Sequence, residues 1–161
     1  MKTNKSLLLT ESGIMLACAT ILSMIEIVRL PYGGSVTLFS MLPVILVAYR
    51  RGTLWGLFTA FAFSLLQMLL GLNNLSYGTS AGAVAAIILL DYVVAFTVLG
   101  LGGLFRFMKS QSAGLALGTL LVCVFRYLAH VVVGFTVWRD ISIPAAQAVV
   151  YSFIYNATYM V

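Results

Sequence analysis

The most regular feature of the chain is a succession of long apolar runs, separated by short stretches rich in polar, charged, glycine and proline residues. A helix that crosses a membrane needs about 20 mostly apolar residues. The runs predict six membrane helices, at residues 7–30, 38–49, 53–72, 82–107, 115–138 and 145–161. Five is the alternative count if the last run does not span. The pattern therefore favours an all-α bundle, a single transmembrane domain over residues 1–161.

The first, second and sixth of these runs differ from a simple membrane helix in their length or their ends. The first is expected to be a retained helix, because more runs follow it and no clear cleavage site of small residues ends it. The second is short and contains Pro43, so we expect it to be tilted, broken there or extended into the preceding loop. The sixth reaches the last residue without a polar end, so we expect the final helix to be truncated.

The composition agrees with a membrane setting. The chain of 161 residues is 62% hydrophobic and 8% charged, with a mean hydropathy of +1.09. A soluble domain of this size carries far more surface charge, so most of the surface is expected to face lipid. The net charge of +5 forms no continuous basic patch in the sequence, which argues against nucleic acid. The sequence contains no GxxxxGK[ST] phosphate loop, so we do not expect it to hydrolyse ATP by that route.

Cysteine and histidine are too sparse for a metal site. Cys18 and Cys123 lie far apart in two apolar runs and are interpreted as small buried residues, not as a disulfide. One histidine without a CxxC pair makes a zinc site unfavourable.

Lysine and arginine predict the orientation. In membrane proteins these residues collect on the cytoplasmic side. Under a six-helix topology six of them fall on one side and two on the other, namely Lys2, Lys5, Arg50, Arg51, Arg106 and Lys109 against Arg29 and Arg139. The N-terminus is therefore expected in the cytoplasm, and the loops around Tyr32, Tyr77 and Asp140 are expected to face outward.

Three ionisable residues lie well inside the apolar runs: Asp91, Arg126 and His130. Such residues are rare at membrane depth and usually face the bundle interior or a wet cavity. With a helical rise of ~1.5 Å per residue, Asp91, His130 and Tyr151 lie roughly 10–13 Å below the outer ends of their helices. Arg126 and Asn156 lie roughly 18 Å below those ends. We therefore expect two levels of polar side chains in the bundle.

A four-residue step places Arg126, His130, Gly134 and Trp138 on one face of a helix. Gly134 is expected to leave space beside His130, where a flat group could rest. With Asp91 at the same level, the set predicts a pocket for a flat, polar, possibly cationic small molecule, because carboxylates accept N–H bonds and aromatic faces hold cations. The alternative is structural: an Asp91–Arg126 ion pair, an interhelical bond of His130 and an interfacial Trp138.

Five segments resemble the thiamine-specific substrate-binding subunits of energy-coupling factor transporters. The resemblance runs from Gly33 to Val161, and the segments are GGSVTLFSMLP (33–43), YRRGTLWG (49–56), LLDYVVAFTVLGLGG (89–103), RYLAHVVVGFTVW (126–138) and YSFIYNATYM (151–160). The resemblance implies a six-helix bundle in the cell membrane that binds thiamine from outside. It also implies a transmembrane coupling subunit and two cytoplasmic ATPase subunits as partners, with ATP hydrolysed by those partners.

The resemblance also implies which residues meet the pyrimidine end of thiamine. The acid that precedes a tyrosine in the fourth helix would receive the aminopyrimidine ring, and here these residues are Asp91 and Tyr92. The tyrosine and asparagine of the last motif, Tyr151 and Asn156, would close that end.

The thiazolium side would be lined by His130 and Trp138, with Gly134 between them and the basic Arg126 one turn below. Relatives carry a tryptophan lid in the first outer loop, and this chain has Tyr32 in its place. Tyr77 is the candidate in the second outer loop.

The family also uses small residues four apart on the first helix to contact the coupling subunit. Gly13 and Ala17 have that spacing, with Ala19 and Ser23 as a second pair, and small residues let helices approach closely. Ordinary packing within the bundle is the alternative.

These observations rank four functions. The leading hypothesis is a thiamine-binding subunit, and the nearest alternative is a subunit for another vitamin or a thiamine precursor. An intramembrane enzyme that uses Asp91 and His130 as an acid–base pair is disfavoured, because no nucleophile motif, second acid or metal-ligand set accompanies them. A structural membrane protein with a buried ion pair is the fourth.

Overall fold

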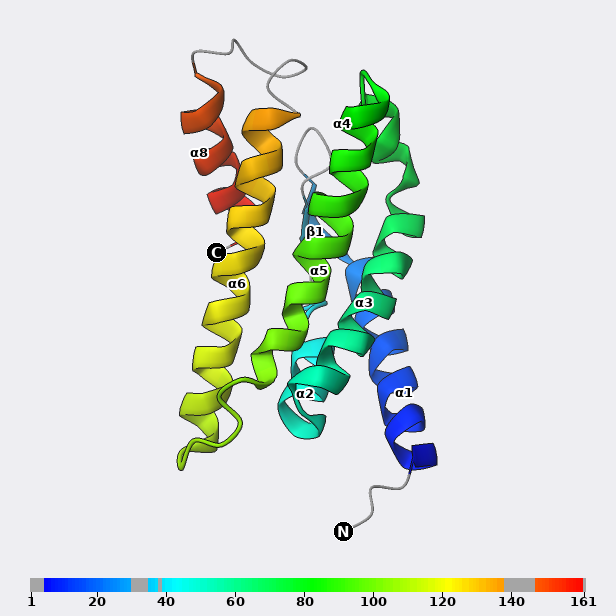
Figure 1. The fold of residues 1–161 in the computed structure, drawn as a ribbon, viewed down its shortest axis with the longest axis vertical. Helices are drawn as coiled ribbons and strands as arrows, with labels where there is room; N and C mark the ends of the chain where they lie inside the picture. The colour runs from blue at the N-terminus through cyan, green and yellow to red at the C-terminus, as the bar shows by residue number, and fades with distance from the viewer. Residues whose placement is uncertain (1–4, 30–34, 38, 138–146, 161) are drawn as a thin grey trace.

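The computed structural model describes residues 5–29, 35–37, 39–137 and 147–160, and it is a bundle of helices with one short hairpin (Figure 1). Its elements in chain order are α1 (Lys5–Ser23), β1 (Glu26–Arg29), β2 (Ser35–Thr37), α2 (Leu42–Arg51), α3 (Thr53–Leu70), the 3₁₀-helix η2 (Leu72–Tyr77), α4 (Ala81–Ala86), the π-helix η3 (Ile87–Val94), α5 (Ala95–Thr97), the 3₁₀-helix η4 (Val98–Gly103), α6 (Gln111–Thr136) and α8 (Ala148–Met160). The four elements from α4 to η4 follow one another without a break and make one rod, Ala81–Gly103.

Four of the described helices are long and apolar enough to cross a membrane: Lys5–Ser23, Thr53–Leu70, the rod Ala81–Gly103 and Gln111–Gly134 within α6. The helices α2 and α8 contain 10 and 13 residues and are shorter than a span needs. Because α1 and α8 lie on opposite sides of the bundle, the rod and α6 occupy its middle (Figure 1).

We expected an all-α chain with a first helix at residues 7–30. That expectation is wrong at the C-terminal end of this first helix. α1 ends at Ser23, and β1 pairs antiparallel with β2 in the register Glu26↔Thr37, Val28↔Val36 and Arg29↔Ser35. The reason is local. These two segments are rich in β-branched residues, which favour strands, and Glu26 and Arg29 place charges where a membrane helix would need apolar side chains.

Pro43 does not break its helix. It lies in the first turn of α2, where a missing backbone N–H costs nothing because the first N–H groups have no partner within the helix. The helix therefore begins later than the predicted residue 38, at Leu42, and continues to Arg51. Its side chains form much of the core, since Val44 and Val47 are completely buried.

The helices approach one another closely at glycines. A Cβ added to Gly100 would overlap the backbone of Leu57 on α3, and one added to Gly118 would overlap the carbonyl of Gly102. These contacts bring α3, the rod and α6 close together around the buried ring of Phe63. The middle of the bundle is therefore rigid enough to hold side chains in fixed positions.

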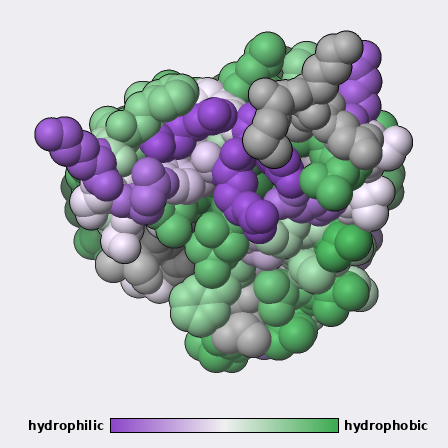
Figure 2. All heavy atoms as spheres, turned by 90° about the horizontal axis from the view of Figure 1, so that it is seen from below, coloured by the Kyte–Doolittle hydropathy of each residue, from purple (hydrophilic) through white to green (hydrophobic). Residues whose placement is uncertain are grey.

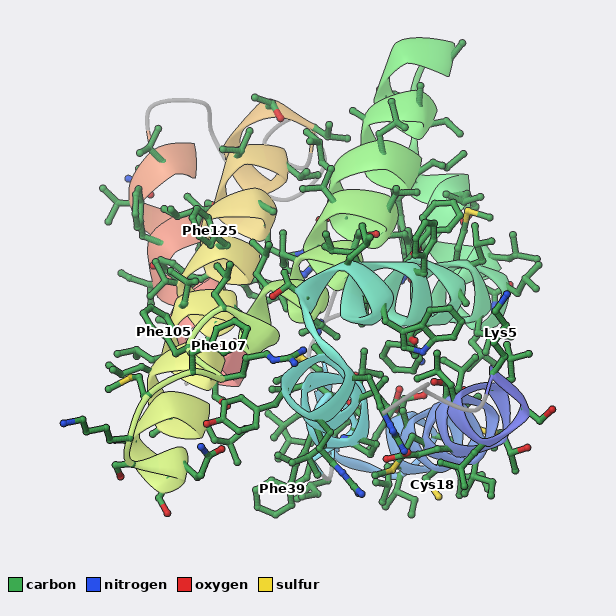
Figure 3. The ribbon with its side chains drawn as sticks, turned by 60° about the horizontal axis from the view of Figure 1, so that its bottom comes forward. Lys5, Cys18, Phe39, Phe105, Phe107 and Phe125 are labelled. Atoms are coloured by element: carbon green, nitrogen blue, oxygen red, sulfur yellow. The ribbon has the colours of Figure 1, made fainter. Side chains whose placement is uncertain are left out.

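Side-chain hydrogen bonds tie α1 to α3. The indole Nε1 of Trp55 donates to Ser12 Oγ, and Gln67 Nε2 donates to Ser23 Oγ, each at 2.8 Å. Much of the remaining surface of α1 is exposed, and Cys18, which we expected to be buried, lies on that exposed surface (Figure 3). Cys18 is exposed on the outer face of α1 with respect to the residues that the structure describes, and hydrophobic character alone does not predict which face of a helix is exposed.

Candidate functional site

The site is built around a contact between Asp91 on η3 and His130 on α6. His130 Nδ1 lies 2.8 Å from Asp91 Oδ1, and the two side chains are 12% and 14% exposed. An ionised carboxylate only accepts hydrogen bonds, so in a pair with ionised Asp91 the proton of this contact lies on His130 Nδ1. A hydrogen bond to an ionised group is stronger than one between neutral groups. The pair therefore fixes both side chains at one point between the rod and α6.

Asp91 lies in a stretch of π-helix. The eight residues of η3 hydrogen-bond to the fifth residue along rather than the fourth, a geometry that is rare and often found at functional sites. Neighbouring residues of a helix point in different directions, and here Asp91 meets α6 while Tyr92 meets the end of α3. The stretch therefore sends two adjacent polar side chains to two different neighbours.

Tyr92 is buried and holds the segment that follows α3. Its hydroxyl donates to the carbonyl of Gly71 at 2.9 Å and accepts from Asn74 Nδ2 at 3.0 Å. Its ring stacks on Phe96 with the centroids 6.5 Å apart. Tyr92 thus connects the rod to η2, the segment that carries Tyr77.

Arg126 lies one turn below His130 on α6 and contacts the core. Its guanidinium carbon lies 4.2 Å from the centre of the Phe96 ring, and Nη1 contacts the sulfur of Met41. A cation over an aromatic face is attracted by the ring quadrupole. Arg126 therefore forms a floor for the space beneath His130, in contact with both the rod and the residue that precedes α2.

Gly134 faces α8. A Cβ at this position would overlap Ser152 Oγ and lie 3.4 Å from Asn156 Nδ2. Ser152 Oγ donates to the carbonyl of Val131, and Asn156 Nδ2 donates to the carbonyl of Ser152. The space that we expected Gly134 to leave for a flat group is occupied by α8, because the glycine allows Ser152 and Asn156 to approach α6.

The remaining predicted contacts are more dispersed. Tyr151 is exposed and stacks on Tyr155 with the centroids 5.7 Å apart, on a different face of α8 from the buried Asn156. Tyr77 ends η2 and is exposed. Tyr32 and Trp138 lie outside the described residues. The structure thus brings together Asp91 with His130 and Gly134 with Asn156, and it places Tyr151 and Tyr77 at the surface.

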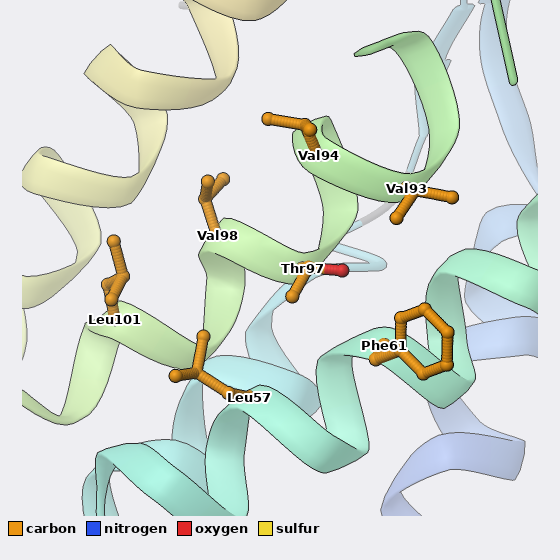
Figure 4. Close-up of a pocket in the computed structure, with 7 residues that line it drawn as sticks. All are labelled: Leu57, Phe61, Val93, Val94, Thr97, Val98 and Leu101. Carbon is orange, nitrogen blue, oxygen red and sulfur yellow. The ribbon is translucent and has the colours of Figure 1, made fainter. Parts of the chain in front are cut away.

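An apolar groove of about 260 Å³ lies elsewhere on the molecule, between α3 and the rod (Figure 4). Leu57 and Phe61 line it from α3, and Val94, Thr97 and Leu101 line it from the rod. The described residues that line it include none of the predicted site residues. It offers almost no polar group that could orient a polar ligand, so it is a poor candidate for the predicted pocket.

The small residues predicted to contact a coupling subunit lie on the outside of α1. Gly13 and Ala17 are exposed, and a Cβ added to Gly13 would have no other group within 4 Å. Gly13 therefore has no packing partner within the described part of the chain that would explain its lack of a side chain.

Sequence reasoning missed Phe96, Met41, Ser152 and Asn74, which hold the predicted residues in place. Two of them carry a signal in their spacing. Phe96 follows Tyr92 by four residues and Ser152 precedes Asn156 by four, so each pair is expected on one helix face. Met41 and Asn74 lie at the start of α2 and in η2, and no periodic pattern indicates them.

A model of the family described as "Thiamine transporter protein (Thia_YuaJ)" matches residues 9–161. The thiamine transporter ThiT of Bacillus subtilis (strain 168) is 33% identical over 165 residues, which cover 95% of this chain and 82% of that protein. ThiT of Lacticaseibacillus paracasei is 26% identical over 128 residues, which cover 73% of this chain and 62% of that protein.

A solved structure of ThiT from Listeria monocytogenes has the same fold. It superimposes with a TM-score of 0.76, covering 98% of this chain and 87% of that chain at 24% sequence identity. With four helices of spanning length and composition, the chain is a multi-pass protein of the cell membrane. The family match covers nearly all of the sequence, and the chain therefore belongs to the family of thiamine transporter proteins.

Proposed function

We propose that this chain is the substrate-binding subunit of an energy-coupling factor transporter and that it captures thiamine from outside the cell. The observation that carries the proposal is the Asp91–His130 contact between η3 and α6. Ionisable pairs inside an apolar bundle are costly, and membrane proteins keep them where a ligand or ion is handled. Membership of the thiamine transporter family supports thiamine as that ligand.

The chemistry of thiamine suits these side chains. Its amino group and ring nitrogens can exchange hydrogen bonds with Asp91, and the carboxylate offsets the positive charge of the thiazolium ring. His130 and Trp138 supply aromatic surfaces for that ring. Asn156 and Tyr151 supply further polar groups from α8, one of them buried and one exposed. Because His130 already donates to Asp91, bound thiamine shares or replaces that hydrogen bond.

Three supporting residues act through other groups in this proposal. Arg126 forms the floor below His130, Gly134 permits the approach of α8, and Tyr92 holds η2 beside the site. The outer-loop tyrosines, Tyr32 and Tyr77, cover the ligand from outside. Closure of these loops would exclude water and strengthen each polar contact with the bound vitamin.

Transport requires partners in this proposal. The chain forms one six-helix domain with its N-terminus in the cytoplasm, a topology that places Lys5, Arg50, Arg51, Arg106 and Lys109 on the cytoplasmic side. Gly13 and Ala17 offer a small-residue surface to a helix of the coupling subunit. Two ATPase subunits supply the energy, which is consistent with the lack of a phosphate loop in this sequence.

Calorimetry on the purified chain tests the ligand. We expect one thiamine bound tightly per chain, with the separate pyrimidine and thiazole fragments binding more weakly, because each makes only part of the contacts. A different vitamin or a fragment that binds more tightly than thiamine would replace it as the substrate. Absence of thiamine binding by folded protein would overturn the proposal.

Reconstitution in vesicles tests which steps of transport this chain performs alone and which need the partner subunits. The chain alone in vesicles should bind thiamine but not concentrate it, and addition of the coupling and ATPase subunits with ATP should produce concentrative uptake. Gly13→Leu should weaken assembly with the coupling subunit and leave thiamine affinity unchanged, because the added side chain lies outside the bundle. Ala116→Leu, at an exposed small residue of α6, is the matched control and should assemble normally.

A further inference from the structure

Three arginines lie at or beside the turn from α2 to α3. Arg50 and Arg51 end α2, Gly52 follows them with a φ of 103°, and the guanidinium of Arg106 lies so close to Gly52 that a Cβ there would overlap its Nη1 atom. Gly52 is required twice, for the positive φ and for the room that Arg106 takes. We call Arg50, Arg51 and Arg106 the arginine cluster.

The charge of the arginine cluster is only partly balanced. Glu11 on α1 accepts hydrogen bonds from Arg51 and lies 3.2 Å from Arg50 Nη1. Among the described residues it is the acidic side chain that contacts the cluster, and it contacts Arg50 and Arg51, while the Arg106 guanidinium lies over the ring of Phe107. Arg51 is mostly buried in this contact, whereas the side chain of Arg50 is 58% exposed. The cluster therefore presents excess positive charge at the surface.

Large apolar side chains surround the cluster and are also exposed. Leu54 at the start of α3 is 71% exposed, Leu104 is 49% exposed and Phe107 is 84% exposed. The Arg106 guanidinium lies 4.8 Å from the centre of the Phe107 ring. Figure 2, which views this end of the bundle, shows hydrophilic side chains gathered across the face beside hydrophobic ones. Such a boundary matches the level at which lipid headgroups meet acyl chains.

We propose that the arginine cluster binds the headgroup phosphate of an anionic phospholipid, with Leu54, Leu104 and Phe107 in contact with its acyl chains. Guanidinium groups form paired hydrogen bonds to phosphate oxygens, and basic pockets between membrane helices attract anionic headgroups. The exposed apolar neighbours favour a lipid over an acidic protein segment, because a lipid carries its apolar tails directly beside its charge.

Native mass spectrometry of the purified chain tests this proposal. The protein is released from nanodiscs that contain equal amounts of phosphatidylglycerol and phosphatidylcholine, and the retained lipids are counted. We expect wild-type protein to retain phosphatidylglycerol in preference to phosphatidylcholine. Arg106→Gln and Arg50→Gln should each reduce that preference about fivefold, the effect expected for one basic group near an anionic lipid surface. Gel filtration and circular dichroism show that each variant remains folded.

Lys5→Gln is the matched control. It removes one positive charge from the same end of the molecule, but Lys5 lies on the opposite side of the view in Figure 3 from Phe107. The control should retain the wild-type preference. An equal loss in Lys5→Gln would show diffuse surface charge and overturn the proposal. Unchanged lipid retention in folded Arg106→Gln would also overturn the proposal. So would variants that keep their lipid retention and lose only their assembly with partner subunits.

Discussion

Two acid–base contacts within the described residues, Asp91–His130 in the bundle and Glu11 with Arg50 and Arg51 at its end, differ in surroundings and in balance. The inner pair joins one carboxylate to one imidazole, and both side chains are less than 15% exposed. The end contact joins one carboxylate to two guanidinium groups, one of which is more than half exposed. A contact between an acidic and a basic side chain therefore occurs once with both side chains buried and once with one of them exposed to water.

The difference teaches where such a contact affects binding and where it affects only packing. In a dry setting the loss of one partner leaves the other with no water to replace it, so the cost is large. At the end of the bundle Glu11 and Arg51 are also mostly buried, but water reaches Arg50 and screens its charge. Under the proposed function the inner pair contacts the ligand, whereas the end contact holds α1 against α2.

Asp91→Asn should have the largest effect. The amide keeps the shape of the carboxylate but removes its charge, and loss of one partner from a buried charged pair costs about 2–5 kcal/mol. We expect thiamine affinity, measured by calorimetry, to fall at least about 30-fold while the protein stays folded. Unfolded protein, or folded protein with unchanged affinity, would give the inner pair the same tethering role as the end contact.

Gly134→Ala should be next and should act on stability. The added methyl group overlaps Ser152 Oγ and forces α8 away from α6. Overpacking of this kind costs about 1–3 kcal/mol, and we expect a melting temperature several degrees lower in detergent. Gly13→Ala is the control, because the new methyl group meets open space, and it should not lower the melting temperature. Equal melting temperatures for both variants would mean that α8 does not depend on this contact.

Tyr92→Phe should have a smaller effect that separates support from ligand contact. The change removes the hydrogen bonds to Gly71 and Asn74 and leaves the ring on Phe96. A lost hydrogen bond of this kind is worth about 1 kcal/mol. We expect a slightly lower melting temperature with nearly unchanged thiamine affinity. A tenfold loss of affinity at unchanged melting temperature would instead place the hydroxyl of Tyr92 on the ligand.

Glu11→Gln should have the smallest effect. The contact lies at the end of the bundle, Arg50 is exposed, and the side-chain oxygen of glutamine can still accept a hydrogen bond from Arg51. We expect thiamine affinity to equal that of wild type and the melting temperature to change little. A loss of affinity comparable to that of Asp91→Asn would remove the distinction between the two contacts.

Depth along the helices could be predicted from the sequence. The rise per residue of a helix is nearly constant, so counting from the helix ends placed Asp91 and His130 at one level, and their side chains meet. The positions of α3 and the start of the rod at Ala81 also follow from the lengths of the apolar runs.

The direction in which each side chain points around its helix could not be predicted in the same way. Rotation about the helix axis depends on which neighbours pack against it, and a nearly uniform apolar sequence gives little periodic signal. Gly134 therefore faces α8 where we expected open space, and Tyr151 points to the surface. The hairpin of β1 and β2 was missed because Ile27 and Val28 of β1 extend the first apolar run beyond Ser23 in spite of the charges of Glu26 and Arg29.

The π-helical stretch has a consequence for how this sequence is compared with its relatives. A π turn holds one residue more than an α turn, so residues on both sides of the stretch keep the faces that they would have in an α-helix one residue shorter. A relative with a regular α-helix and the same flanking faces would have one residue fewer near Asp91, and its alignment with this chain would need a gap there. An alignment without that gap would pair Asp91 with a residue that points away from α6.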